Sequence, residues 1–402
     1  MANLRKQSLS STSRSSRKIE VIRTYLLRAK LPEVMGWSQG RFDTRQTLLV
    51  QIIADDGAEG WGECAGIPAV NQAAIHEVFA PILLGRDPLQ VDVLWHTLWQ
   101  ASQPWGRRGI LPAALSGVDI ALWDLRGKAL GQPISEMMGG RQRDRVPCYA
   151  TGLYFRDRPE TELIPLLVQE AESYVEAGYR AVKAHIGRNL SYDKALLKAL
   201  RTALPNIWLL ADAGHGYNLP EAQYIGRAME ENGYYWFEDP ISQERPEQLR
   251  QLADVTRLSI ACGKTEQTAF GFHSLLAPGG VSYAEPDVTY CGGLSEAERI
   301  RSVAVGFGVA VAPHTGSNAT MIGLAATLHF LASTFRHPGR GENTMSLLER
   351  NGSPNPLRDA IFSVPLEIDY GSAQVPTTPG LGVTVDMEEM RSFCVSEQET
   401  RA

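Results

Sequence analysis

Seven short apolar runs between residues 181 and 349 constrain the fold more than any other feature of the chain. Each run ends in a polar or charged residue, and successive ends lie 23 to 35 residues apart. This interval is long enough for a strand, a helix and two loops, and helical patterns such as 192–204 and 219–232 fill it. The polar residues that end the runs are His185, Asp212, Glu238, Lys264 with Glu266, Asp287, His314 and Glu349.

Strands that alternate with helices at this interval predict a parallel sheet covered by helices. Such a sheet can close into a barrel, in which functional residues collect on loops at the carboxyl ends of the strands. Because the polar residues stand at those ends, we expect their side chains to converge on one mouth of the barrel. The pattern therefore predicts the α/β class and places the functional site at that mouth.

The overall composition argues against several classes of protein. With 402 residues the chain is long enough for a barrel and one further domain, and its 44% hydrophobic and 21% charged residues are typical of a soluble globular protein. A net charge of −6 without a basic domain argues against a nucleic-acid binder. No apolar run reaches the roughly 18 residues that a membrane span needs. Five scattered cysteines, an odd number, predict reduced thiols in a cytoplasmic protein.

Four segments are expected along the chain. Residues 1–18, rich in Ser and Arg and without acids, predict a disordered tail, with a transit peptide as the alternative. Residues 19–145 read as strands followed by helices, which predicts a separate α+β domain. The barrel is expected over 146–354. Residues 355–402 lose the barrel rhythm and are expected to return to the first domain.

Two segments of the first domain, residues 31–44 and 64–73, read as long loops. Long loops are commonly binding elements, so we expect both to act as lids over the barrel mouth. Trp37 and Arg41 lie in the first segment and are expected to shape substrate binding. The alternative is that both segments are ordinary connections.

Several motifs follow one another in a fixed order. They are residues 56–63, 115–124, 127–131 with 139–140, 183–185, 237–240, Asp287 before 291–293, His314 and 379–382. Through these motifs the sequence, from about residue 19 to 393, resembles the enolase superfamily, within its mandelate racemase-like group. The resemblance implies an α+β capping domain over a modified (β/α) TIM-type barrel, and we expect a homo-oligomer. It also implies Mg²⁺-assisted abstraction of a proton next to the carboxylate of a small-molecule substrate.

That chemistry makes severe physical demands. A carbon acid beside a carboxylate is very weak, so the negative charge of the enediolate must be neutralised as it forms. A divalent cation bound to the carboxylate can contribute several kcal/mol of that stabilisation. Side-chain acids and bases that move the protons each contribute roughly 10² to 10⁴ in rate.

The resemblance assigns the acid–base catalysts to His185 and His314. Lys183 lies two residues before His185, so on a strand both side chains point to one face, and Lys183 is expected near the substrate carboxylate. Asp287 is expected to hold the other nitrogen of His314 and to fix its tautomer. Glu349 is expected to donate a hydrogen bond to substrate as a carboxylic acid. The alternative for Lys183 and His185 is that they merely pair with barrel carboxylates.

The metal site departs from the family pattern. Asp212 and Glu238 match the first two carboxylate ligands, but Lys264 stands at the third position, and an ammonium has no lone pair to donate. Glu266, two residues later, would share that face of a strand and could complete a displaced Mg²⁺ site. Alternatively, the ammonium of Lys264 lies where Mg²⁺ would lie, which we favour slightly because two adjacent cations repel. His215 could contact substrate or water, or simply cap its loop.

Three functions remain open from the sequence. Dehydration of an acid sugar is the first choice, because dehydratases populate much of the group that the sequence resembles. The alternative reaction is that of a racemase or epimerase acting on a 2-hydroxy acid or amino acid derivative, in which the second histidine returns the proton to carbon. The third is a catalytically impaired relative with a binding role, which Lys264 alone supports.

Overall fold

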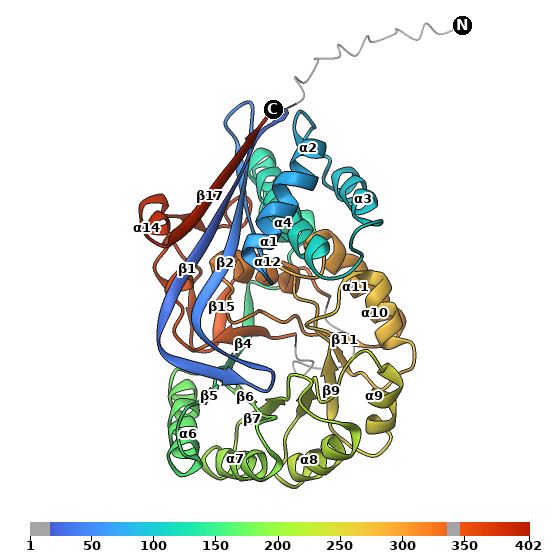
Figure 1. Cartoon of the computed structure of the whole chain (residues 1–402), viewed down its shortest axis with the longest axis vertical. Coiled ribbons are helices and arrows are strands. Elements are labelled where there is room, and N and C mark those ends of the chain that lie inside the picture. The colour runs from blue at the N-terminus through green and yellow to red at the C-terminus, as the bar shows by residue number, and fades with distance from the viewer. Residues whose placement is uncertain (1–16, 336–345) are drawn as a thin grey trace, which may run out of the picture.

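The computed structural model describes residues 17–335 and 346–402 and shows a capping domain above a barrel (Figure 1). Residues 1–16 of the predicted tail lie outside the described part. The cap is built on an antiparallel sheet in the order β17–β1–β2–β3. Its strands are β1 (Ile19–Trp37), β2 (Gly40–Ala54), β3 (Glu59–Cys64) and β17 (Cys394–Arg401).

Helix α4 (Ile110–Leu130) lies directly against β3. A Cβ on Gly62 would lie 1.9 Å from the carbonyl oxygen of Gly117, and one on Gly60 would lie 2.0 Å from that of Ala121. Glycine at these positions therefore permits a close approach that any side chain would block. The other cap helices are α1 (Pro68–Ala74), which continues through a π-helical turn (Ile75–Phe79) into α2 (Ala80–Leu83), α3 (Val91–Ser102) and α5 (Ile134–Met137).

The predicted barrel class is confirmed. Within the described residues, the hydrogen-bonded ladder of parallel strands runs from β12 through β4 and β6 to β11. These strands are β4 (Arg145–Thr151), β6 (Ala181–His185), β7 (Trp208–Asp212), β8 (Trp236–Glu238), β9 (Ser259–Cys262), β10 (Tyr283–Ala284), β11 (Ala310–Val311) and β12 (Leu348–Asn351). The helices between them are α6 (Glu160–Glu176), α7 (Leu190–Ala203), α8 (Leu219–Glu231), α9 (Pro246–Ala253), α10 (Thr268–Leu276), α11 (Leu294–Gly306) and α12 (Met321–Ala332).

An apolar floor closes the inside of the barrel. It consists of Tyr149, Ala181, Leu210, Trp236, Ala261, Tyr283 and Ala312, all buried in one cluster. Side chains alternate along a strand, so Asp212 lies on the same inward face as Leu210, and Glu238 on the same face as Trp236. His185 lies beside Asp212 in the ladder, and Asp212 beside Glu238. This register lifts the polar strand ends above the floor as one row.

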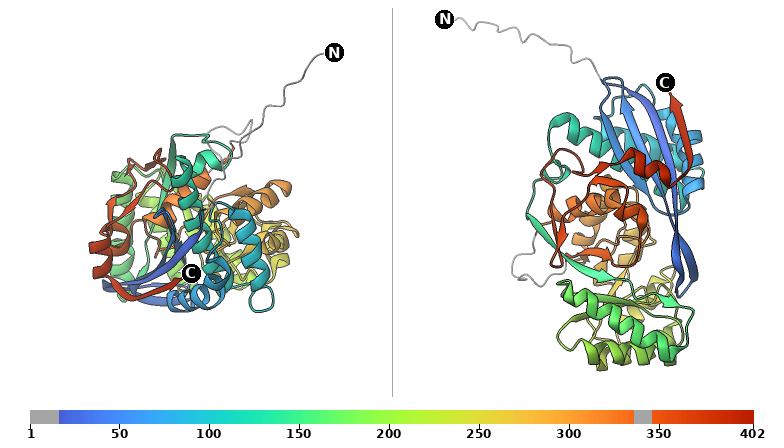
Figure 2. Two further views of the ribbon diagram at one scale, coloured as in Figure 1. Left: turned by 90° about the horizontal axis from the view of Figure 1, so that it is seen from above. Right: turned by 90° about the vertical axis from the view of Figure 1, so that its left-hand side faces the viewer.

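The expectation of two long loops in the cap is wrong. Residues 31–44 form the far end of the β1–β2 hairpin, which reaches from the cap to the barrel (Figure 2), and β5 (Phe155–Arg156) pairs with β1 beside it. Residues 64–73 comprise the end of β3, a short connection at 65–67 and most of α1. Leu31 and Met35 are buried against Tyr154, so the hairpin has an apolar face of its own, which its Pro- and Gly-containing sequence conceals.

The C-terminal segment contacts both domains. Its elements are α13 (Pro356–Asp359), β13 (Phe362–Val364), β14 (Ile368–Asp369), β15 (Ser372–Gln374), β16 (Thr384–Val385) and α14 (Met387–Ser392) before β17. Strand β15 pairs with barrel strand β4, whereas β17 pairs with β1 of the cap. In the described ranges, no helix is both long and apolar enough to span a membrane.

Candidate active site

One continuous network of ionisable side chains crosses the barrel mouth. Neighbouring members are separated by 2.6 to 3.9 Å, and a histidine lies at or near each end. In spatial order the members are His185, Asp212, Lys264, Glu238, Lys183, Glu349, His314 and Asp287. The structure thus brings together residues that lie in or just after seven barrel strands and that the sequence singled out one by one.

Lys264 lies at the centre of three carboxylates. Its Nζ lies 2.6 Å from Asp212 Oδ1, 3.0 Å from Glu238 Oε1 and 3.1 Å from Asp239 Oδ2. Burial disfavours the charged ammonium, but the three carboxylates outweigh it and hold the pKa of Lys264 well above its ordinary value. Burial likewise opposes the charge of Asp212, yet attraction from Lys264 keeps the pKa of that carboxyl below its usual range.

Asp239 joins this cluster although the sequence did not single it out. Strand β8 ends at Glu238, and Asp239 adopts a left-handed backbone conformation with φ of 38°. Strand alternation therefore no longer applies, and the carboxylate turns toward Lys264. His215 lies at the same edge, with Nε2 3.5 Å from Asp239 Oδ2 and Nδ1 3.1 Å from the carbonyl oxygen of Ile241.

The structure does not bring Glu266, one of the two alternatives for completing the metal site, to the carboxylate cluster. Strand β9 ends at Cys262, and residues 263–266 form a turn in which the Glu266 amide donates to the Gly263 carbonyl at 2.9 Å. The two-residue alternation of a strand therefore does not carry over to Glu266. Its carboxylate instead pairs with Arg108 at 3.0 Å and accepts the backbone N–H of Gln267 at 2.8 Å.

Lys183 is a second buried cation, with 1% of its side chain exposed. Its Nζ lies 2.8 and 2.7 Å from the two oxygens of Glu238 and 2.8 Å from Glu349 Oε1. Burial opposes this charge, but the neighbouring carboxylates raise the pKa of Lys183 well above its ordinary value. The structure therefore shows the pairing with barrel carboxylates that the alternative interpretation described.

Glu349 is placed as an acceptor. Besides its contact with Lys183, its Oε2 accepts the backbone N–H of Thr315 at 2.9 Å. Burial favours the neutral acid, but Lys183 and His314 together lower the pKa of Glu349 below its ordinary value. This arrangement suits an ionised carboxylate and differs from the hydrogen-bond-donating acid that the resemblance implies.

His314 is held in one orientation by Asp287. Its Nδ1 lies 2.9 Å from Asp287 Oδ2, while Asp287 Oδ1 accepts both the backbone N–H and the hydroxyl of Thr289, at 2.8 and 2.6 Å. The Nε2 of His314 faces Glu349 Oε2 at 3.9 Å. Burial opposes protonation, but the carboxylates of Glu349 and Asp287 raise the pKa of His314 above its ordinary value.

The pKa of His185 is shifted in the opposite direction from that of His314. Burial lowers the pKa of His185 to about 4, so the ring is neutral near pH 7. Its Nδ1 lies 3.5 Å from Asp212 Oδ2, and its buried Nε2 has no hydrogen-bond partner among the described residues. The ring stacks on Tyr154 with centroids 4.3 Å apart.

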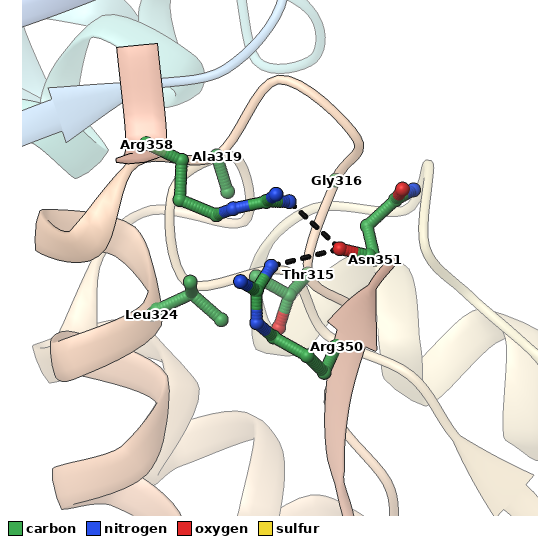
Figure 3. A pocket seen from close by; sticks show the side chains of 7 residues that line it. All are labelled: Thr315, Gly316, Ala319, Leu324, Arg350, Asn351 and Arg358. Atoms are coloured by element: carbon green, nitrogen blue, oxygen red, sulfur yellow. Dashed lines mark hydrogen bonds between the residues drawn. The ribbon is translucent and has the colours of Figure 1, made fainter. Parts of the chain in front are cut away.

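Strand β12, which carries Glu349, is fixed by two arginines (Figure 3). Arg350 and Arg358 both donate to the backbone carbonyl oxygen of Asn351, at 2.8 and 2.7 Å. The amide of Asn351 in turn donates to the hydroxyl of Tyr154 at 2.9 Å. Sequence reasoning missed these supports; the bond between Asn351 and Tyr154 joins segments that are far apart in the chain, whereas the two arginines are local to Asn351.

The hairpin tip of the cap reaches the barrel at Gly214. Ser38 Oγ donates to the Gly214 carbonyl at 3.1 Å, and a Cβ on Gly214 would lie 2.7 Å from Cε3 of Trp37. Trp37 therefore packs against Gly214, which follows Asp212 of the network by two positions. Arg41 instead pairs with exposed Asp157 at 3.6 Å. From the sequence we expected both Trp37 and Arg41 to shape substrate binding. Of the two, only Trp37 contacts the loop after β7, the strand that carries Asp212.

A divalent metal ion does not fit this arrangement. Asp212, Glu238 and Asp239 offer carboxylate oxygens that lie within 4.8 Å of one another and could hold a metal ion. However, the ammonium of Lys264 already lies among these oxygens. A Mg²⁺ ion there would compete with this ammonium for the same carboxylate oxygens. The ammonium itself has no lone pair and cannot serve as a ligand.

Comparisons with known proteins agree with this architecture. Residues 18–139 match the mandelate racemase / muconate lactonizing enzyme N-terminal domain, and residues 166–390 match the enolase C-terminal domain-like family. The chain is 36% identical over 377 residues to D-galactarolactone cycloisomerase of Agrobacterium fabrum, covering 94% of this chain and 98% of the relative. It is 33% identical over 344 residues to arabinonate dehydratase of Saccharolobus solfataricus, covering 85% and 88%.

A solved structure extends the likeness to the whole fold. The crystal structure of a racemase from Streptomyces coelicolor A3(2) with bound magnesium has a TM-score of 0.82 to this chain at 27% identity. The similarity covers 94% of this chain and 100% of the racemase chain. Together with the two domain matches, it shows that the chain belongs to the mandelate racemase/muconate lactonizing enzyme family of the enolase superfamily.

Proposed function

We propose that the chain dehydrates an acid sugar. The observation that carries the proposal is the pair of histidines on one network with complementary hydrogen bonding. His185 has a buried Nε2 without a partner among the described residues, so this nitrogen can accept a proton. His314 lies between the carboxylates of Asp287 and Glu349, which favour the protonated ring that can donate one.

The bond changes follow from these roles. His185 Nε2 takes the proton from the carbon next to the substrate carboxylate, and the electron pair of that C–H bond enters an enediolate. The ammonium groups of Lys264 and Lys183 stabilise its negative charge, and they act strongly because the site is buried. His314 then protonates the hydroxyl on the next carbon, the C–O bond breaks, and water leaves. The resulting enol rearranges to a 2-keto-3-deoxy acid.

The similarity to D-galactarolactone cycloisomerase favours a second candidate. The same proton abstraction would be followed by departure of a ring oxygen in place of a free hydroxyl. The leaving oxygen then stays attached to the product, so the substrate is isomerised and no water is lost. Racemisation is the third outcome, in which a histidine returns a proton to the same carbon.

A single experiment separates these reactions. The full chain is incubated in D₂O with a library of aldonic, aldaric and lactone or anhydro acids, and the products are examined by NMR and mass spectrometry. Dehydration gives a keto acid lighter by one water, cycloisomerisation gives an isomer, and racemisation gives a deuterated acid of unchanged structure. If no acid exchanges its proton, the proposed dehydration is refuted and the alternative of a binding role is favoured.

A further inference from the structure

Lys264 places a positive charge at the point where three carboxylates meet. Its ammonium contacts Asp212, Glu238 and Asp239 at 2.6 to 3.1 Å, and its side chain is only 9% exposed. Asp212 and Glu238 accept hydrogen bonds from this ammonium, and Asp239 Oδ2 adds an ion-pair contact. We propose that this ammonium replaces a divalent metal ion, so that the chain holds its carboxylates together and carries out its reaction without one.

Both oxygens of Glu238 are already engaged by ammonium groups. Glu238 Oε1 faces both ammonium groups, at 2.8 Å from Lys183 and 3.0 Å from Lys264, and its Oε2 lies 2.7 Å from Lys183. Mg²⁺ needs near-octahedral oxygen ligands at about 2.0–2.1 Å. It could approach Asp212 only if Lys264 gave up its ion pairs and moved its buried ammonium elsewhere.

The backbone holds Lys264 in this place. Gly263 has φ of 118°, and a Cβ there would lie 2.7 Å from the ring of Phe272. The turn is closed by the hydrogen bond from the Glu266 amide to the Gly263 carbonyl. The turn therefore aims residue 264 at the three carboxylates, whichever side chain stands there.

This geometry suggests a charge-matched variant. A glutamate with one bound Mg²⁺ carries the same net charge as one lysine ammonium. Lys264→Glu should therefore be destabilised without metal and recover when Mg²⁺ fills the space. Lys264→Met removes the ammonium without adding a carboxylate and should gain weaker Mg²⁺ binding. Lys198→Glu makes the same charge change at an exposed position of α7 and serves as the control.

The test uses the full chain and measures metal content after equilibrium dialysis with Mg²⁺, and Tm with and without Mg²⁺. We expect the parent and Lys198→Glu to hold far less than one equivalent and to show no Tm shift. Lys264→Glu should hold about one equivalent, and its Tm should rise by several degrees at a hundredfold excess over Kd. If Lys264→Glu does not fold, the gain of Mg²⁺ binding by Lys264→Met decides the question.

The functional half of the inference rests on the proposed reaction and has its own readout. Turnover by the parent should persist after exhaustive treatment with EDTA. Stoichiometric Mg²⁺ in the parent, or activity lost to EDTA and restored by Mg²⁺, would overturn the inference. Failure of Lys264→Glu and Lys264→Met to bind Mg²⁺ would also overturn it. A parent that turns over no acid sugar would refute the proposed function, while the metal-binding and Tm results would still stand.

Discussion

Replacing Asp287 with asparagine should change the tautomer of neutral His314, so that the ring proton moves from Nδ1 to Nε2. Asp287 Oδ1 accepts two hydrogen bonds from Thr289, so the asparagine oxygen will keep that side and its NH₂ group will face His314 Nδ1. That nitrogen must then accept a hydrogen bond, and the ring proton moves to Nε2. The imidazole also loses the carboxylate charge that stabilises its protonated form.

The size of the effect follows from the charge removed. Two unit charges about 4 Å apart attract by about 4 kcal/mol at an effective dielectric constant of 20. The pKa of His314 should therefore fall, while Glu349, 3.9 Å from His314 Nε2, continues to favour the protonated ring. We expect kcat for Asp287→Asn to drop by roughly 10² to 10⁴, the usual contribution of a positioned acid.

Two measurements check this reasoning. The alkaline limb of the pH profile of kcat should move to lower pH than in the parent, because His314 holds its proton less tightly and loses its ability to donate it sooner as the pH rises. The ¹⁵N shifts of the His314 ring should report the exchanged tautomer even if no substrate is known. A variant with unchanged Tm that retains the parent rate and pH profile would refute the role assigned to this pair.

Three further predictions test other parts of the structure. Gly214→Ala would bring a Cβ to 2.7 Å from the Trp37 ring, so the hairpin tip must shift. Steady-state kinetics should then show a higher KM and an altered preference among acids. An unchanged KM would exclude the hairpin from substrate binding. Lys183→Met removes one buried cation from Glu238 and Glu349 and should lower the free energy of unfolding by about 3–5 kcal/mol in urea denaturation. A negligible loss would mean that these ion pairs are not stabilising. Burial lowers the pKa of His329 to about 4 in the folded chain, whereas in the unfolded chain the pKa is about 6.5. Between these two pH values the unfolded chain binds more protons than the folded chain, so the free energy of unfolding decreases as the pH falls. His329→Gln, whose amide can keep both hydrogen bonds, should flatten this acid limb in Tm measurements, and an identical limb would contradict the assignment.

The strand ends were predictable because strand periodicity is local. A run such as Trp208–Asp212 carries its own alternation, and the interval to the next run leaves room for one helix. Parallel strands in register then bring His185, Asp212 and Glu238 side by side without further information. The same reasoning does not reach the hairpin around residues 31–44, which was mistaken for a long loop because its buried face depends on Tyr154, more than a hundred residues away.

By itself, the sequence determined the barrel, the row of polar strand ends and the lysine at the third metal position. Only the tertiary structure decided what that lysine does. Lys264 and Glu266 are equivalent candidates while the strand is assumed to continue, but β9 ends at Cys262 and the following turn sends Glu266 to Arg108 and Lys264 to the carboxylates. Asp239 entered the cluster for the same reason, since its left-handed backbone is set by the turn after β8. Side-chain direction follows from strand alternation only within a strand, and beyond its end the packing of the turn decides it.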